Sequence, residues 1–148
     1  MSKAKELVLG TLKEYGKIVA QGVQEKAAEM SGTELYAKDD FIPYFNPERQ
    51  YLNYKAGYVC KSAAGRVVRL IQPYDSTIYT GQPEELAAHW GFVWSTDPKK
   101  ALPFVAISTS PYNKGEYCTE DGVVYRSLID TNTFKPSEYP QGWEVYVA

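Results

Sequence analysis

The sequence predicts a mainly β protein with an N-terminal α-helix and two tandem, small antiparallel β modules. Three observations predict this fold: apolar residues at helical spacing near the N-terminus, abundant tyrosine and valine beyond it, and a pattern that occurs twice. The predicted domains are residues 1–40, a helix and its connector that anchor or oligomerise the chain, residues 41–96, the first module, and residues 97–148, a linker with the second module.

The repeat is the main evidence for two modules. Tyr54–Cys60 is echoed by Tyr112–Cys118, Gly65–Arg69 by Gly122–Arg126, and Pro83–Trp90 by Pro136–Trp143, always in the same order. Most of the length difference falls between Arg69 and Pro83. Because the whole pattern is duplicated, any function has to explain why two copies are needed.

The N-terminal segment from Lys3 to Met30 is predicted to form an amphipathic helix. Its apolar positions recur at spacings of three and four residues: Leu7, Val8, Leu12, Tyr15, Val19 and Val23. Three glycines each destabilise such a helix by about 1 kcal/mol relative to alanine. The helix therefore needs a partner, which is either the body of the same chain or a second copy. Ser31-Gly32 is predicted to end it, and Thr33–Phe41 to form a connecting segment.

The strands are predicted from β-branched and aromatic residues bounded by glycine and proline. The expected strands are Gly57–Lys61, Arg66–Gln72 and Trp90–Ser95 in the first module, and Gly115–Thr119, Val123–Ile129 and Trp143–Val147 in the second. Asp121-Gly122 is a strong hairpin signal, so this turn fixes the register of the second module. Arg69 and Arg126 are predicted on the outer face of the second strand of each module, solvated or paired.

Composition excludes several classes of function. The formal net charge is −2 and no basic cluster is present, which argues against nucleic-acid binding. No run of about 18 apolar residues predicts a membrane span, and the N-terminus does not read as a signal peptide. His89 is the single histidine and there is no Cys-x-x-Cys, so neither a metal site nor a cofactor is expected. Cys60 and Cys118 occupy equivalent positions and are predicted to be buried, reduced thiols.

The chain is predicted to be non-catalytic, with no catalytic residues. His89 has no counterpart in the second copy, where Gly142 precedes the tryptophan. The acid pairs Glu84-Glu85 and Glu120-Asp121 lie in predicted loops or turns, whereas glycosidases hold two carboxyl groups across a cleft. A Gly-x-Ser-x-Gly nucleophile elbow is also missing.

The order of aromatic, glycine and proline positions resembles the small chitin-binding modules of bacterial chitinases, carbohydrate-binding module families 5 and 12. The residues that carry the resemblance are Phe45, Tyr51, Gly57, Gly65, Val68, Pro83 and Trp90 in copy one, and Tyr112, Gly115, Gly122, Tyr125, Pro136 and Trp143 in copy two. Chitin-binding modules usually place two exposed aromatics just after the second strand. This chain instead has Leu70-Ile71-Gln72 and Leu128-Ile129-Asp130 there.

The tandem arrangement, with the linker Trp94–Pro98 followed by Pro103–Ala106, is similar to proteins encoded among the tail and baseplate genes of phages and prophages of Gram-positive bacteria. The resemblance implies a virion protein of the tail, baseplate or capsid surface, assembled in the host cytoplasm. It also implies attachment to other virion proteins through the N-terminal helix, a homo-oligomeric state, and binding to cell-wall polysaccharide. The alternative is a purely structural capsid decoration or head-fibre protein whose β modules pack against other proteins.

Within this resemblance, the candidate carbohydrate-binding residues are the loop aromatics Tyr79, Phe134 and Tyr139. They either stack on sugar rings or fold back to cap the small cores. Trp90 and Trp143 each close a repeat and are predicted to be buried structural anchors. The two functions differ in one further expectation: protein packing places aliphatic residues such as Ile71 and Leu128 at the surface, whereas glycan binding leaves them in the core.

Overall fold

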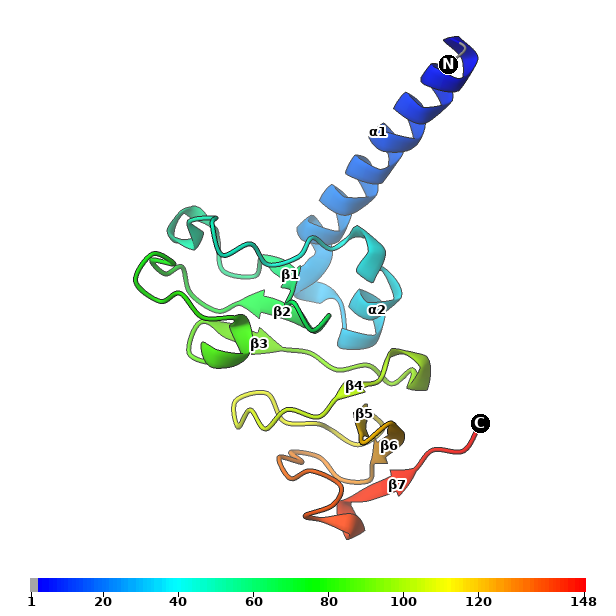
Figure 1. The fold of residues 1–148 in the computed structure, drawn as a ribbon, viewed down its shortest axis with the longest axis vertical. Coiled ribbons are helices and arrows are strands. Elements are labelled where there is room, and N and C mark those ends of the chain that lie inside the picture. The colour runs from blue at the N-terminus through cyan, green and yellow to red at the C-terminus, as the bar shows by residue number, and fades with distance from the viewer. Residues whose placement is uncertain (1–2) are drawn as a thin grey trace.

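The computed structural model describes the backbone of residues 3–148 and the side chains of residues 10–148. An N-terminal helix leads into two sheets that follow one another along the long axis of the molecule (Figure 1). The protein is therefore mainly β with an N-terminal α-helix, as the sequence predicts.

The helical region is longer than predicted. Helix α1 spans Lys3–Lys26 and is followed by a 3₁₀ turn at Ala27–Glu29. Ser31 does not end a helix; it begins the short helix α2, Gly32–Ala37, as its N-cap. The Glu34 backbone N–H donates to the Ser31 hydroxyl at 3.1 Å, and the Ser31 N–H donates to the Glu34 carboxylate at 3.3 Å. This reciprocal capping box turns the predicted connector into a helix.

The first sheet has the strand order β1-β2-β3 and is fully antiparallel. Its strands are β1, Val59–Lys61, β2, Val67–Leu70, and β3, Trp90–Phe92. The second sheet has the order β4-β5-β6-β7. Its strands are β4, Leu102–Pro103, β5, Tyr117–Glu120, β6, Val123–Ser127, and β7, Trp143–Val145. The short strand β4 was not predicted, and it runs parallel to β5.

The sequence repeat is also a repeat of strand pairing. Cys60 lies opposite Val68 in the first sheet, and Cys118 lies opposite Tyr125 in the second. Trp90 and Trp143 face equivalent positions on the neighbouring strand of their sheets. Before β1 and β5 the chain turns at Gly57 and Gly115, whose φ angles of 96° and 93° favour glycine.

Each module is built around one buried tyrosine. Tyr51 stacks between the rings of Phe45 and Tyr74, and the Trp90 ring meets it edge-on at 5.3 Å. In the second module, Tyr112 stacks between Phe104 and Trp94, and the Trp143 ring meets it at 5.4 Å. The structural counterpart of Tyr112 is therefore Tyr51 and not Tyr54, which the sequence match pairs with it.

The two modules share one hydrophobic core. Trp94 follows β3 of the first sheet, yet its ring stacks on Tyr112 with a centroid distance of 4.3 Å. Its indole N–H donates to the Ser110 carbonyl at 2.9 Å, and the Phe92 N–H donates to the Ser110 hydroxyl at 2.9 Å. A continuous cluster of buried side chains therefore runs from Phe45 to Trp143.

Among the described side chains of α1, those near its C-terminal end dock on this body. Val23 and Ala27 are buried with Val59 and Val67 in a second, smaller cluster. The Gln24 amide donates to the Val59 carbonyl at 2.7 Å and accepts from the Val59 N–H at 3.1 Å. The outer turns of α1 project away from the sheets (Figure 1).

Arg69 ties the end of α1 to the first sheet. Its half-buried guanidinium donates to the carbonyls of Ala27 and Met30, at the point where the helical segment ends. The Ala27 carbonyl also accepts the Met30 N–H at 3.2 Å, and a cation is favourable beside the carbonyls at the end of a helical segment. The prediction that Arg69 is solvated or ion-paired is therefore wrong.

Candidate functional site

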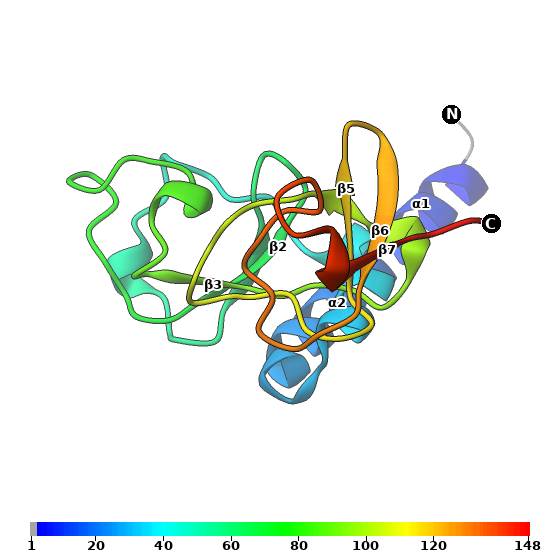
Figure 2. The same ribbon diagram turned by 90° about the horizontal axis from the view of Figure 1, so that it is seen from below.

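The long loop of the first module extends away from α2, whereas the long loop of the second module lies nearer the axis of the stack (Figures 1 and 2). These are the loop 73–88 between β2 and β3 and the loop 128–142 between β6 and β7. All three candidate carbohydrate-binding residues belong to them. Tyr79 is 51% exposed and Phe134 is 54% exposed, while Tyr139 is half-buried.

In the second module, Phe134 and Tyr139 form an aromatic pair. Their ring centroids are 5.6 Å apart and the planes differ by 34°. The backbone of Phe134 is fixed to the core, because its carbonyl accepts the indole N–H of the buried Trp143 at 2.7 Å. Tyr139 lies directly over Gly142, where an added Cβ would come within 2.4 Å of the ring. Trp143 thus fixes the backbone of Phe134, and Gly142 leaves the space that the Tyr139 ring occupies.

In the first module, Tyr79 lies beside His89 with a centroid distance of 5.2 Å. His89 itself stacks on the buried Tyr74 at 4.6 Å. The loop is shaped by Asp75, whose carboxylate accepts from the Thr77 hydroxyl at 2.5 Å and from the Gln50 amide at 2.9 Å. These hydrogen bonds, first from Thr77 and then from Gln50, lower the pKa of Asp75.

His89 and Gly142 are equivalent positions of the repeat. The His89 carbonyl accepts the N–H of Ile71 at 2.7 Å, and the Gly142 carbonyl accepts the N–H of Leu128 at 2.9 Å. Both modules therefore place a loop tyrosine beside the residue that precedes the buried tryptophan. The structure pairs Phe134 with Tyr139, whereas Tyr79 lies in the other module with His89. Sequence reasoning did not include His89 because it looked for histidine only as a metal ligand or catalytic group.

Aliphatic side chains occupy the surface where chitin-binding modules usually carry their aromatic pair. Ile71 is 49% exposed and Leu128 is 36% exposed. Ile71 lies over Gly91 of the neighbouring strand, 3.7 Å from the position of an added Cβ. Their exposure is the arrangement expected for protein packing, whereas the exposure of Tyr79 and Phe134 is the one expected for sugar stacking.

Trp90 and Trp143 lie in the core and present no face to a ligand. Trp90 is fully buried, and its indole N–H donates to the Tyr74 hydroxyl at 2.9 Å. Trp143 is also buried and donates to the loop carbonyl already described. Each tryptophan connects the core of its module to the loop that carries the exposed aromatics.

Two cysteines and two glutamates of the body are buried or engaged in structural contacts. Cys60 and Cys118 are buried and free, and burial raises the pKa of each thiol to about 12. Glu84 pairs with Arg66 at 3.0 Å. The Glu120 carboxylate accepts from both the N–H and the hydroxyl of Ser137, each at 3.0 Å.

Within the part of the chain that the structure describes, no cluster of three or more His, Cys, Asp or Glu side chains is placed to hold a metal ion. Among the same residues, no helix has the length and apolar character needed to cross a bilayer.

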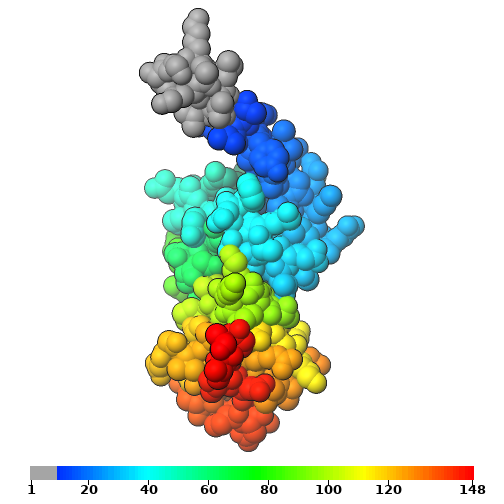
Figure 3. Space-filling model, turned by 90° about the vertical axis from the view of Figure 1, so that its right-hand side faces the viewer, coloured from blue at the N-terminus to red at the C-terminus, as the bar shows by residue number. Residues whose placement is uncertain are grey.

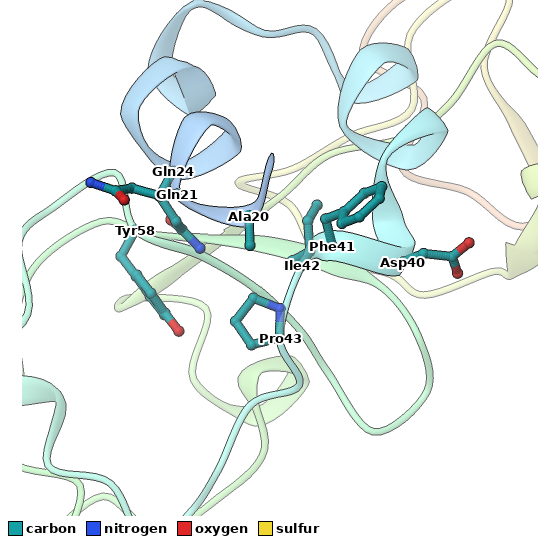
Figure 4. Close-up of a pocket in the computed structure, with 8 residues that line it drawn as sticks. All are labelled: Ala20, Gln21, Gln24, Asp40, Phe41, Ile42, Pro43 and Tyr58. Carbon is teal, nitrogen blue, oxygen red and sulfur yellow. The ribbon is translucent and has the colours of Figure 1, made fainter. Parts of the chain in front are cut away.

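A groove lies beside the base of α1, with a volume of about 330 Å³. Figure 4 shows Ala20 of α1 between Tyr58 on one side and Ile42 on the other. Its lining residues are Ala20, Gln21, Gln24, Asp40, Phe41, Ile42, Pro43 and Tyr58. Both polar atoms of the Gln24 side-chain amide are already hydrogen-bonded to the Val59 backbone, so they are not free to bind a ligand. The groove is therefore largely apolar and suits packing better than the recognition of a polar small molecule.

No protein-family model matches this chain, and no curated protein is significantly similar to it.

Proposed function

We propose that the protein is a non-catalytic phage virion protein of the tail, baseplate or capsid surface that binds glycans of the host cell wall through its loop aromatics. The observation that carries the proposal is the pair formed by the exposed Phe134 and the half-buried Tyr139, held on a loop whose backbone is hydrogen-bonded to a buried tryptophan. Aromatic rings fixed in this way suit stacking against the flat faces of sugar rings, because little conformational freedom is lost on binding.

The duplication supports binding to a polymer. Tyr79, on the long loop between β2 and β3, gives the first module its own exposed ring. One stacked ring contributes on the order of 1 kcal/mol, which is a weak contact. Two linked sites on one chain raise the effective concentration of the second site to about millimolar, and many copies on a particle raise it further.

The position of α1 supports attachment to a particle. Its outer turns leave the body at the end remote from the second module (Figure 1). A helix that projects in this way fits a role in holding the chain to virion proteins or to other copies, while the loops of both modules remain accessible.

The test is retention of the purified protein on insoluble chitin and on Gram-positive cell walls. Phe134→Ala or Tyr139→Ala is expected to weaken retention about fivefold, and the double variant more than tenfold. Tyr79→Ala tests the first module in the same way. Tyr44→Ala is the matched control, because Tyr44 is 61% exposed, somewhat more than Tyr79 and Phe134, but lies outside both long loops. Retention that survives all loop substitutions would contradict glycan binding through these residues.

The exposed aliphatic residues favour a second candidate function, a capsid decoration or head-fibre protein whose β surfaces pack on neighbouring proteins. Ile71 and Leu128 carry this alternative. Ile71→Ser with Leu128→Ser is expected to abolish incorporation into particles if the β surface is an interface. Under the glycan-binding proposal, the same double variant leaves retention on chitin and cell walls unchanged.

A further inference from the structure

The internal repeat gives each module the same outer sheet face. On the first module this face carries Val59, Val67, Arg69 and Val93, and on the second module the equivalent residues are Tyr117, Val124, Arg126 and Tyr146. The equivalence follows from the hydrogen bonds. Val59 pairs with Arg69 as Tyr117 pairs with Arg126, and the N–H of Val93 donates to Val67 as that of Tyr146 donates to Val124.

On the first module, this face holds helices. Val23 from the last turn of α1 and Ala27 from the 3₁₀ turn that follows are buried against it, and Arg69 donates to the carbonyls at the end of the helical segment. Helix α2 covers the neighbouring part of the face, where the Tyr36 hydroxyl donates to the Val93 carbonyl at 3.0 Å. The face is therefore suited to receiving a helix.

On the second module, no described helix covers the equivalent face. A groove of about 420 Å³ remains there, lined by Tyr117, Arg126, Glu144, Val145, Tyr146 and Val147. The rings of Tyr117 and Tyr146 meet edge-on at 5.6 Å, and Arg126 reaches Glu144 at the long distance of 3.7 Å. Figure 3 shows this side of the molecule, with α2 and the base of α1 above and the C-terminal residues open to solvent below.

The same chain carries a helix surface without a described partner. On the outer turns of α1, the side chains of Leu12, Tyr15 and Ile18 are each more than half exposed. At 100° per residue they form one stripe, and Glu14 borders it next to Ile18. Lys13 and Lys17 lie on the opposite side of the helix. The stripe and the groove lie at opposite ends of the molecule, so they cannot meet within one chain (Figure 1).

We propose that the outer turns of α1 of one copy dock in the second-module groove of another copy. Tyr15 and Ile18 pack against Tyr117 and Tyr146, and Glu14 faces Arg126. A second copy is the occupant because the chain supplies both halves of the contact, with an acidic group bordering the stripe and a cation in the groove. The contact joins two different surfaces, so it propagates head to tail. It rests on the assembly role proposed for α1 and not on glycan binding.

The experiment measures the mass of the full chain against concentration by sedimentation equilibrium. The helix variant carries Tyr15→Ser and Ile18→Ser, and the groove variant carries Arg126→Glu and Tyr146→Ser. Lys13→Ser with Lys17→Ser is the control for the opposite side of the helix. The average mass of the natural chain is expected to rise with concentration beyond that of a dimer, and so is that of the control. Each of the other two variants is expected to raise the dissociation constant at least tenfold.

Mixing identifies the contact. An equimolar mixture of the two variants contains one intact stripe and one intact groove, so it is expected to form heterodimers and nothing larger. Glu14→Arg combined with Arg126→Glu is expected to restore association to within about threefold of the natural chain, whereas each reversal alone weakens it. Circular dichroism verifies that every variant is folded.

Three results would overturn the proposal: a natural chain that stays monomeric up to about millimolar concentration, a groove variant that assembles like the natural chain, or a mixture that forms no heterodimer. The second result would point to a helix–helix coiled coil instead. Retention on chitin, measured on the same variants, reports glycan binding separately, since the groove variant keeps Phe134, Tyr139 and Tyr79.

Discussion

The hydroxyl of Tyr36 accepts the backbone N–H of Val67 at 3.0 Å, in place of the carbonyl of a neighbouring strand. The same hydroxyl donates to the Val93 carbonyl at 3.0 Å and thereby joins α2 to both β2 and the segment after β3. Tyr36→Phe leaves this buried donor and acceptor without a partner, so we expect a loss of about 1–3 kcal/mol of unfolding free energy. Urea denaturation measures it, and the exposed Tyr15→Phe is the control. Equal midpoints for the two variants would contradict the assigned role.

Stability is expected to fall at alkaline pH. Burial raises the pKa of Tyr51 from 10.0 to about 12, and that of Cys60 and Cys118 from 9.0 to about 12. In the unfolded chain these groups lose their protons near their ordinary values, while the folded chain keeps them. Unfolding therefore releases protons between pH 9 and pH 12, and the unfolding free energy decreases as pH rises through this window.

Urea midpoints from pH 8 to pH 11 check this pH dependence. The variant Cys60→Ala with Cys118→Ala is expected to show a smaller decrease between pH 9 and pH 10, because both thiols have been removed. A decrease of unchanged size in this variant would show that the thiols do not contribute.

The repeat provides its own control for Arg69. Arg69→Ala removes the donor to the carbonyls of Ala27 and Met30, so we expect a loss of about 1.5–3 kcal/mol. Amide hydrogen exchange is expected to accelerate in the last turns of α1. Arg126→Ala at the equivalent position removes only a long, exposed pair with Glu144, and the monomer is expected to lose less than about 1 kcal/mol. Similar losses for both variants would argue against the anchoring of α1 by Arg69.

Two glycine-to-alanine substitutions are expected to act in opposite directions. At Gly32, an added Cβ would lie 2.1 Å from the Trp94 carbonyl oxygen, so Gly32→Ala forces backbone apart and is expected to cost about 3 kcal/mol or more. At Gly10, nothing lies within 4 Å and the residue is helical, so Gly10→Ala is expected to stabilise α1 by up to about 1 kcal/mol. Thermal denaturation by circular dichroism distinguishes the two effects.

The sequence was sufficient to predict the N-terminal helix and the three antiparallel strands of each module, because their signals are local, but it did not indicate β4. The glycines at 65 and 122 mark turns with positive φ, and each is followed by a strand that begins with a pair of valines. Helix α2 was missed although its capping box is visible in the sequence, since Ser31-Gly32 was interpreted as the end of one helix and not as the start of another. Local patterns do not specify the partner of Arg69, because its carbonyl acceptors lie about forty residues away in the chain.

Part of the candidate site could also be predicted from the sequence. Phe134 and Tyr139 could be proposed from their place in a proline-bounded loop, but their contact depends on Gly142, whose missing side chain makes room for the Tyr139 ring. The relation between Tyr79 and His89 depends on how the longer first loop folds over Tyr74, which spacing alone does not determine.

The position of Trp94 determines where this protein can be divided and recombined. The residue belongs by sequence to the first repeat, but its ring is one of the two that enclose Tyr112. A chimera that exchanges the second module at a junction after Trp94 would separate that ring from the tyrosine it covers, whereas a junction at the end of β3 transfers both together. The segment that can be exchanged as a unit is therefore offset from the segment that forms the sheet, because the second module needs Trp94 from the end of the first repeat.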